Sequence, residues 1–85
     1  MNRKSTIREV GRRTRLKNRD VQLMLETLIT VWTEELARGG RIEIENFAVI
    51  ELRTIERAAN RLLPKRRLRQ IVVRASKALR EKLNS

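Results

Sequence analysis

The sequence predicts a small α+β domain with the element order helix, helix, hairpin, basic arm and short helix. A change of pattern indicates this class. Apolar residues recur every three or four positions as far as Leu36, as on a helix, and then alternate with polar residues from Arg41 onward, as on a strand. The 85 residues contain no repeat and no low-complexity linker, so we expect one domain over residues 1–85.

Two helices are expected in residues 1–40. The segment Thr6–Glu9 fits a capping box and predicts a first helix over roughly 6–14, weakened by Gly11. Asn18 is the candidate N-cap of a second helix, which Arg38-Gly39-Gly40 ends. Apolar residues extend well beyond one face of this helix, and so short a chain cannot cover them, which indicates a dimer core. The expected core residues are Val21, Leu25, Leu28, Trp32 and Leu36, with Phe47 from the hairpin turned into the core.

The sheet and arm are expected in residues 41–75. Apolar and acidic residues alternate over Arg41–Glu45, the pattern stops at Asn46, and it resumes over Ala48–Arg53, which predicts a hairpin. Ile71–Val73 is a candidate third strand. Residues 76–85 are expected to hold a short C-terminal helix, drawn from Ala75–Leu83 and capped by its serine.

Charge is segregated along the chain. The net charge is +11, and residues 53–85 and 1–20 are strongly basic while residues 21–52 are acidic. The segment Arg53–Arg74 holds eight basic residues and one acid, and its apolar residues form no helix face, so an anionic partner is the simplest reason for it. The arginines of the first helix are either a solvated face or further contacts to that partner.

Several classes of protein are disfavoured. The chain has no His and no Cys, which removes the commonest general base and the usual metal ligands, so we expect no enzyme, no metal site and no cofactor. Its aromatic residues are Trp32 and Phe47 alone, too few to stack single-stranded bases. No apolar run reaches a membrane span and no signal peptide is evident, so a cytoplasmic protein is expected.

Four segments, in register across nearly the whole chain, carry a family resemblance. They are Ile7, Val10 and Leu16–Asp20; Glu34–Gly39; Ile42, Ile44 and Asn46–Ile50; and Ser76–Leu79. Together they resemble the HU/integration-host-factor family of bacterial nucleoid proteins. The resemblance implies two N-terminal helices, a three-stranded antiparallel sheet with a β-ribbon arm, and a short C-terminal helix, paired as an intertwined dimer. In that family the arms grip the DNA minor groove and a proline near each tip inserts between base pairs.

The implied function is that of an architectural protein of the bacterial nucleoid. It would bind and bend duplex DNA with low sequence specificity, as a homodimer or a heterodimer, without a small-molecule substrate or a membrane. The expected DNA-binding residues are Arg53, Arg57, Arg61, Lys65, Arg66, Arg67, Arg69, Arg74, Lys77, Arg3 and Lys4. Two other hypotheses stay open: an RNA-binding or ribosome-associated protein, and an assembly module for an acidic protein partner.

Three departures from the family pattern concern the hairpin and the arm. Asn46 and Ala48 stand where the family has glycines, the arm is shorter, and its usual Arg-Asn-Pro tip is missing. The residues Leu62, Leu63 and Pro64 lie near the expected tip. Either Pro64 or the two leucines would be the wedge, and the alternative is that the proline only ends a strand or turn.

Overall fold

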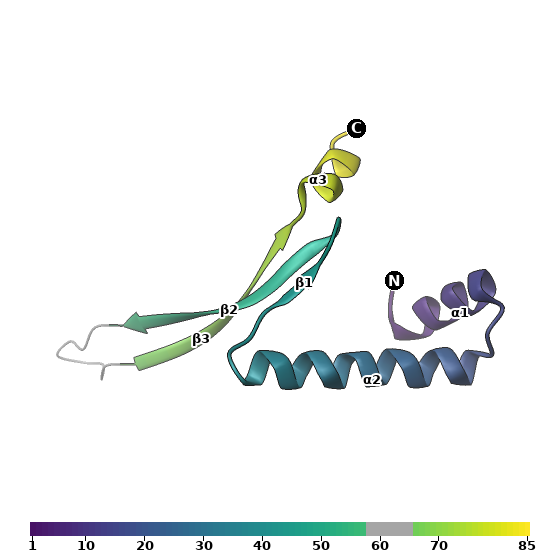
Figure 1. Ribbon diagram of the computed structural model, residues 1–85, viewed down its shortest axis with the longest axis horizontal. Coiled ribbons are helices and arrows are strands. Elements are labelled where there is room, and N and C mark those ends of the chain that lie inside the picture. Colours follow the sequence, from purple (N-terminus) through teal and green to yellow (C-terminus); the bar gives the residue numbers. More distant parts are fainter. Residues whose placement is uncertain (58–65) are drawn as a thin grey trace. The chain divides into compact units, whose positions relative to one another are not determined.

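The computed structural model describes residues 1–57 and 66–85 and confirms the α+β class (Figure 1). Its elements are α1 (Arg3–Thr14), α2 (Asn18–Ala37), β1 (Ile42–Ile44), β2 (Ala48–Arg57), β3 (Arg66–Ala75) and α3 (Lys77–Leu83). The three strands form one antiparallel sheet in the order β1-β2-β3. The chain divides into two compact units, Met1–Glu34 and Glu35–Ser85, and the division falls within α2.

The first helix begins earlier than the sequence analysis predicted, and the predicted capping box is wrong. Asn2 is the N-cap: its side chain accepts a hydrogen bond from the Ser5 amide at 2.9 Å, and its own amide donates to the Ser5 hydroxyl at 2.9 Å. The Thr6 hydroxyl donates to the Asn2 carbonyl, and Glu9 accepts from Arg13 instead of reaching back to a cap. A serine three residues after the cap fills the role expected of the glutamate.

The junction between α1 and α2 depends on a close approach at Gly11. This glycine is buried, and a Cβ on it would lie 2.5 Å from the Asn18 side-chain oxygen. The helix ends at Thr14, and its C-cap Arg15 has a left-handed φ of 61°. Asn18 is the first residue of α2 and not its N-cap, because the Val21 amide donates to the Lys17 carbonyl. Gly11 therefore makes room for this turn.

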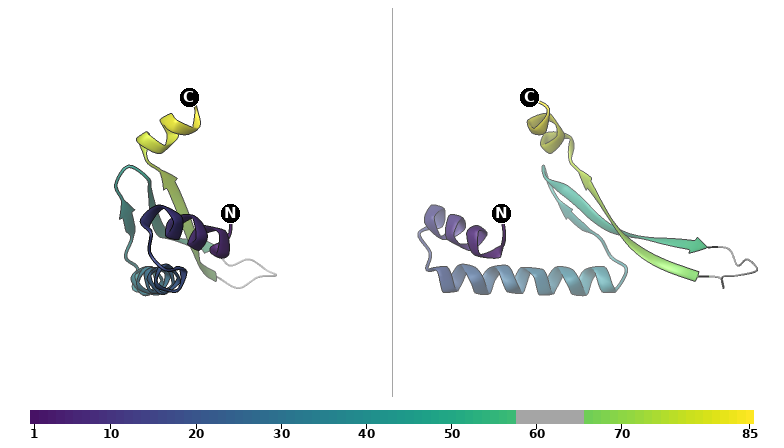
Figure 2. Two further views of the ribbon diagram at one scale, coloured as in Figure 1. Left: turned by 90° about the vertical axis from the view of Figure 1, so that its right-hand side faces the viewer. Right: turned by 180° about the vertical axis from the view of Figure 1, so that it is seen from behind.

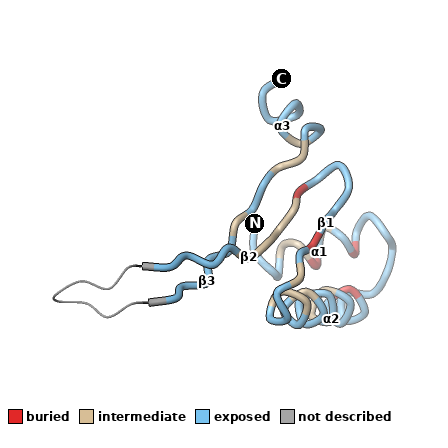
Figure 3. The backbone as a smooth tube through the Cα atoms, turned by 60° about the vertical axis from the view of Figure 1, so that its left-hand side comes forward, coloured by how far each residue is buried: buried red, intermediate tan, exposed pale blue. Residues whose placement is uncertain are grey.

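The core of the first unit is small. Ile7 of α1 and Val21 of α2 are buried, at 8% and 4% exposure. An apolar groove of about 370 Å³ lies between the two helices and includes Val10, Met24 and Leu28, all of which remain exposed. Among the residues predicted for a dimer core, Leu25, Trp32 and Leu36 are half-buried and Leu28 is exposed. Most of the apolar surface of α2 is thus uncovered within one chain (Figure 3).

The end of α2 has the glycine termination that the sequence predicted. The Gly40 amide donates to the Glu35 carbonyl and the Gly39 amide to the Leu36 carbonyl, each at 3.0 Å. Gly39 has a φ of +84°. This is the Schellman arrangement, in which a left-handed glycine lets the chain turn back over the last helical carbonyls.

The predicted hairpin is confirmed. Ile42 pairs with Ile50 and Ile44 with Ala48, and Asn46 takes a φ of 63° in the connecting turn. Phe47 on the turn is 57% exposed within one chain, so its place in a dimer core stays a prediction.

The strands β2 and β3 form a long ribbon. Their register runs without interruption from the pair Ala48–Ala75 to the pair Arg57–Arg66, so β3 extends well beyond the predicted Ile71–Val73. Since β1 pairs with β2 only as far as Ile50, the outer part of the ribbon has two strands, and it twists along its length (Figure 2). After β3 the Ser76 hydroxyl accepts from the Leu79 amide at 3.0 Å, which confirms the predicted cap of α3.

Candidate nucleic-acid interface

The predicted basic arm coincides with the β2–β3 ribbon. Arg53 lies on β2, and Arg67, Arg69 and Arg74 lie on β3. Arg57 and Arg66 form the outermost backbone pair of the described ribbon. The other arm predictions fall outside the described residues: Arg61, Lys65 and the wedge candidates Leu62, Leu63 and Pro64.

The register divides the ribbon into two faces, because side chains alternate along a strand and directly opposed residues share a face. The face that we call the Arg53 face carries Glu43, Val49, Glu51, Arg53, Ile55, Leu68, Gln70, Val72 and Arg74. The opposite one, the Arg69 face, carries Ile42, Ile44, Ala48, Ile50, Leu52, Thr54, Glu56, Arg67, Arg69, Ile71, Val73 and Ala75. The base of the Arg69 face is apolar, and the base of the Arg53 face is charged.

A chain of ion pairs covers the base of the Arg53 face. Arg41 pairs with Glu43 and lies 3.8 Å from the Glu51 carboxylate, which lies 3.2 Å from the Arg74 guanidinium. The sequence analysis did not single out Arg41. The alternation itself could have found it, because Arg41 comes directly before β1, two positions from Glu43, and lies beside the strand that carries Glu51 and Arg53.

Farther out, the Arg53 face carries no described acid beyond Glu51. Arg53 is exposed and lies opposite the neutral Gln70. The next rung is an apolar pair, Ile55 and Leu68, at 41% and 44% exposure. A cationic rung followed by an apolar rung can contact phosphates and the sugar edges between them.

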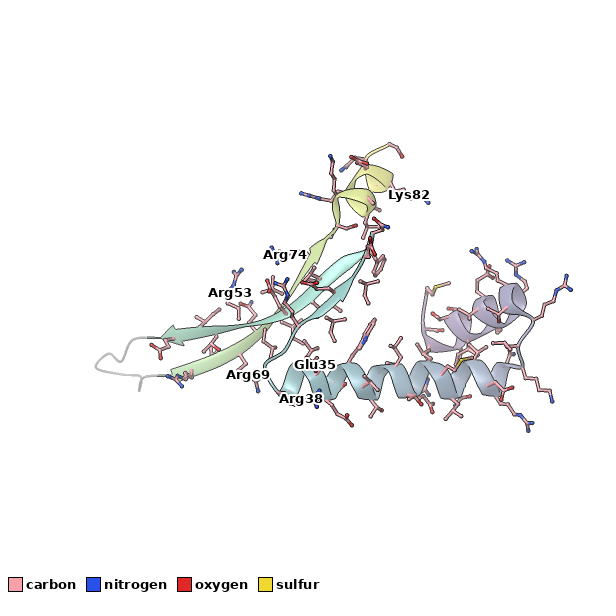
Figure 4. The ribbon with its side chains drawn as sticks, viewed as in Figure 1. Glu35, Arg38, Arg53, Arg69, Arg74 and Lys82 are labelled. Carbon is pink, nitrogen blue, oxygen red and sulfur yellow. The ribbon has the colours of Figure 1, made fainter. Side chains whose placement is uncertain are left out.

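The two arginines of the Arg69 face have partners within the chain. Arg67 lies 3.2 Å from the Glu56 carboxylate across the ribbon. Arg69 donates through one Nη2 to the carbonyls of Leu36 and Ala37, at 3.3 Å and 3.4 Å. Figure 4 shows Arg69 near the end of α2. The arginines that the sequence analysis treated as one set are thus held in different environments.

The remaining predicted contacts lie outside the ribbon. Lys77 begins α3 and is well exposed, 4.0 Å from the Glu81 carboxylate. Arg3 and Lys4 belong to the first unit, where Arg3 lies 3.4 Å from Glu26. Such exposed pairs are worth about 0.2–1 kcal/mol at most, so a phosphate can readily replace the carboxylate.

Among the described residues, the Glu9 carboxyl has a shifted pKa. Hydrogen bonds from Arg12 and Arg13 lower the pKa of the Glu9 carboxyl on α1. Within residues 1–57 and 66–85, no three acidic side chains gather as a metal site would require. No helix of that described part is long and apolar enough to cross a membrane.

Known proteins resemble this chain in fold and, in part, in sequence. A family model described as "Bacterial DNA-binding protein" matches residues 1–84. A curated relative, DNA-binding protein HU of Thermotoga maritima, is 36% identical over 53 residues, a match that spans 62% of this chain and 59% of that protein. The structure of an HU mutant from the same organism has a TM-score of 0.78 at 31% identity and covers 98% of this chain and 99% of that one.

A second solved structure, a cocrystal of Anabaena HU with DNA, has a TM-score of 0.76 at 19% identity and covers 98% of this chain and 97% of that one. At this identity the likeness concerns the fold. The family match over residues 1–84, together with the Thermotoga structure, confirms the resemblance found in the sequence. The chain belongs to the HU family of bacterial DNA-binding proteins.

Proposed function

We propose that this protein is an architectural DNA-binding protein, which holds duplex DNA with the β2–β3 ribbon and bends it with little sequence specificity. The observation that carries the proposal is an exposed two-stranded ribbon that bears arginines, in a chain of this family. The Anabaena HU structure is a cocrystal with DNA, and the likeness in fold supports the same partner here.

The Arg53 face is the face that we assign to DNA. Arg53 is exposed beside the neutral Gln70, and on the other face Arg69 is bound to the end of α2. The charge of Arg67 on that other face is offset by Glu56, as Glu51 offsets that of Arg74 on the Arg53 face. Arginines that neutralise phosphates release counterions, so binding falls steeply with salt. The minor groove presents a degenerate pattern of donors and acceptors, which accounts for low sequence specificity. Sequence preference then follows the cost of deforming the DNA.

The functional unit that we propose is a homodimer, with a heterodimer as the alternative. Within the described residues the buried apolar side chains are Ile7, Val21, Ile42 and Ala48, a small core for 85 residues. At the base of the Arg69 face, Ile71 and Val73 stay 60% and 62% exposed. A second copy that covers this surface and the exposed side of α2 accounts for both observations. Sedimentation equilibrium gives the mass that tests it.

We place this function in the bacterial nucleoid, in the cytoplasm, with no catalytic step and no cofactor. The family supports DNA as the partner, and the ribbon needs no bound group to present its arginines.

The test is a salt titration of affinity for three duplexes of one length: intact, nicked, and carrying unpaired bases. A protein that bends DNA prefers the nicked and unpaired duplexes, because they cost less to deform. Arg53→Ala is the informative variant. It should weaken binding and lower the salt slope by about 0.9 for each phosphate contact removed.

Arg12→Ala is the matched control, since it removes the same charge from α1 and leaves Glu9 its hydrogen bond with Arg13. It should keep the wild-type slope. Equal losses in both variants would contradict the assignment of the arm. Equal affinity for intact and nicked DNA would contradict bending. Absent binding at moderate salt would favour RNA or an acidic protein as the partner.

A further inference from the structure

The arm is tied to the end of α2 by one arginine. Arg69, on the outer two-stranded part of the ribbon, donates to the carbonyls of Leu36 and Ala37, the last two residues of the helix. Leu36 and Ala37 lie 33 and 32 positions before Arg69 in the sequence. All of these residues belong to the unit Glu35–Ser85, so the contact is internal to one compact body.

The last turn of α2 has no basic residue of its own, and Arg69 supplies a cation there. A helix accumulates negative partial charge at its last carbonyls, and cations there stabilise it. The 20-residue α2 has an acidic residue in its first turn and no basic residue in its last turn. The glycine amides bond to the carbonyls of Glu35 and Leu36, and Arg38 is bound to the Glu35 carboxylate at 2.6 Å. Arg69 brings a guanidinium from β3 to this end.

Arg69 lies at a position along the ribbon where its contact with α2 can restrain the direction of the arm. Its strand partner is Thr54, four residues beyond Ile50, where the pairing with β1 stops. From that point outward the ribbon has two strands, and two strands alone bend and twist readily. A bond placed there restrains the direction in which the arm leaves the sheet.

We propose that Arg69 is a positioning residue: it clips the arm to the C-terminal end of α2, sets the arm's direction, and does not bind a phosphate. This inference rests on the proposed DNA-binding function and differs from the expectation that Arg69 is a phosphate contact. The clip lowers the cost of ordering the arm when it closes on DNA. A chain without it still binds DNA, with arms that point over a wider range.

Arg69→Met tests the clip, because it keeps an unbranched stem and removes every donor. Arg67→Met is the matched control: it lies two residues away on the same strand and face, and its partner is Glu56. Without DNA, amide exchange over the last turn of α2 should rise about two- to fivefold in Arg69→Met, the factor that corresponds to a cation at a helix end. In Arg67→Met this exchange should stay at the wild-type rate.

With DNA, the Arg69→Met protein should keep the wild-type salt slope. Its preference for nicked over intact duplex should fall, and the distribution of bend angles in a doubly labelled duplex should widen. A slope that falls as in Arg53→Ala would overturn the proposal and make Arg69 a phosphate ligand. Unchanged exchange and bending would also overturn it. If the wild type binds no DNA, the proposed function fails, and the exchange experiment still decides on the clip.

Discussion

Replacing Gly39 by Ala should destabilise the fold through the backbone alone. Gly39 ends α2 with a φ of +84°, and nothing lies within 4 Å of the place where a Cβ would stand. The substitution therefore introduces no clash. What it introduces is an L-residue in the left-handed region, where the Cβ comes too close to its own neighbouring carbonyl.

The magnitude follows from two opposed effects. The left-handed conformation costs an alanine about 1–2 kcal/mol. The unfolded chain loses freedom when glycine becomes alanine, which returns about 0.4–1 kcal/mol. The net expectation is a loss of about 1 kcal/mol in the free energy of unfolding, or about 4–8 °C in Tm for a domain of this size. Gly39→Asn should lose less, since asparagine tolerates this region, as Asn46 does in the hairpin of the same chain.

The assay is thermal and urea unfolding followed by circular dichroism, with all proteins at one concentration, because the stability of an oligomer depends on it. A Gly39→Ala protein as stable as the wild type would refute the left-handed termination of α2. So would a Gly39→Asn protein that is no more stable than the alanine variant, because the cost would then not depend on φ.

Two further predictions concern carboxylates. Glu56→Gln should tighten DNA binding by at most about fivefold in an affinity titration, because two unit charges 4 Å apart in water interact by about 1 kcal/mol. The control Glu81→Gln on α3 should change the affinity less. If Glu56→Gln instead weakened the complex, Glu56 would aid binding by holding Arg67. In an NMR titration, the pKa of the Glu9 carboxyl should lie below its ordinary value of 4.5, because hydrogen bonds from Arg12 and Arg13 favour the charged form. Its stabilising effect is then present above that value and lost as the pH falls through the lowered pKa, and a Glu9 carboxyl that titrates at or above 4.5 would contradict these hydrogen bonds.

The sequence predicted the boundaries of helices and strands correctly where a few neighbouring residues give a strong signal. The change of period at Arg41, the glycine pair after Arg38 and the serine before α3 each depend on a few neighbouring residues, and the structure places those boundaries within a residue or two. The start of α1 was predicted wrongly because Asn2 and Thr6 both fit a cap, and only the hydrogen bonds decide between them. Capping residues alone do not fix a boundary when two are close together.

The candidate site was less predictable than the fold. The arginine-rich part of β3 has no clean alternation, so its length became visible only when it paired with β2. The different environments of Arg53 and Arg69 follow from the register and from a contact across more than 30 residues. Composition indicates that such a segment needs an anionic partner, but it does not tell which of its cations is already occupied.

The uninterrupted register of β2 and β3 also limits how the arm can change in length. Each residue added to or removed from one strand exchanges the two faces beyond that point, so a single deletion between Ile50 and Arg53 would turn Arg53 toward the apolar side. Removing two residues from each strand preserves the facing and shortens the reach by about 7 Å. Between the base of the ribbon and Arg53, the arm can therefore be lengthened or shortened without loss of its charged side only by two residues at a time in each strand.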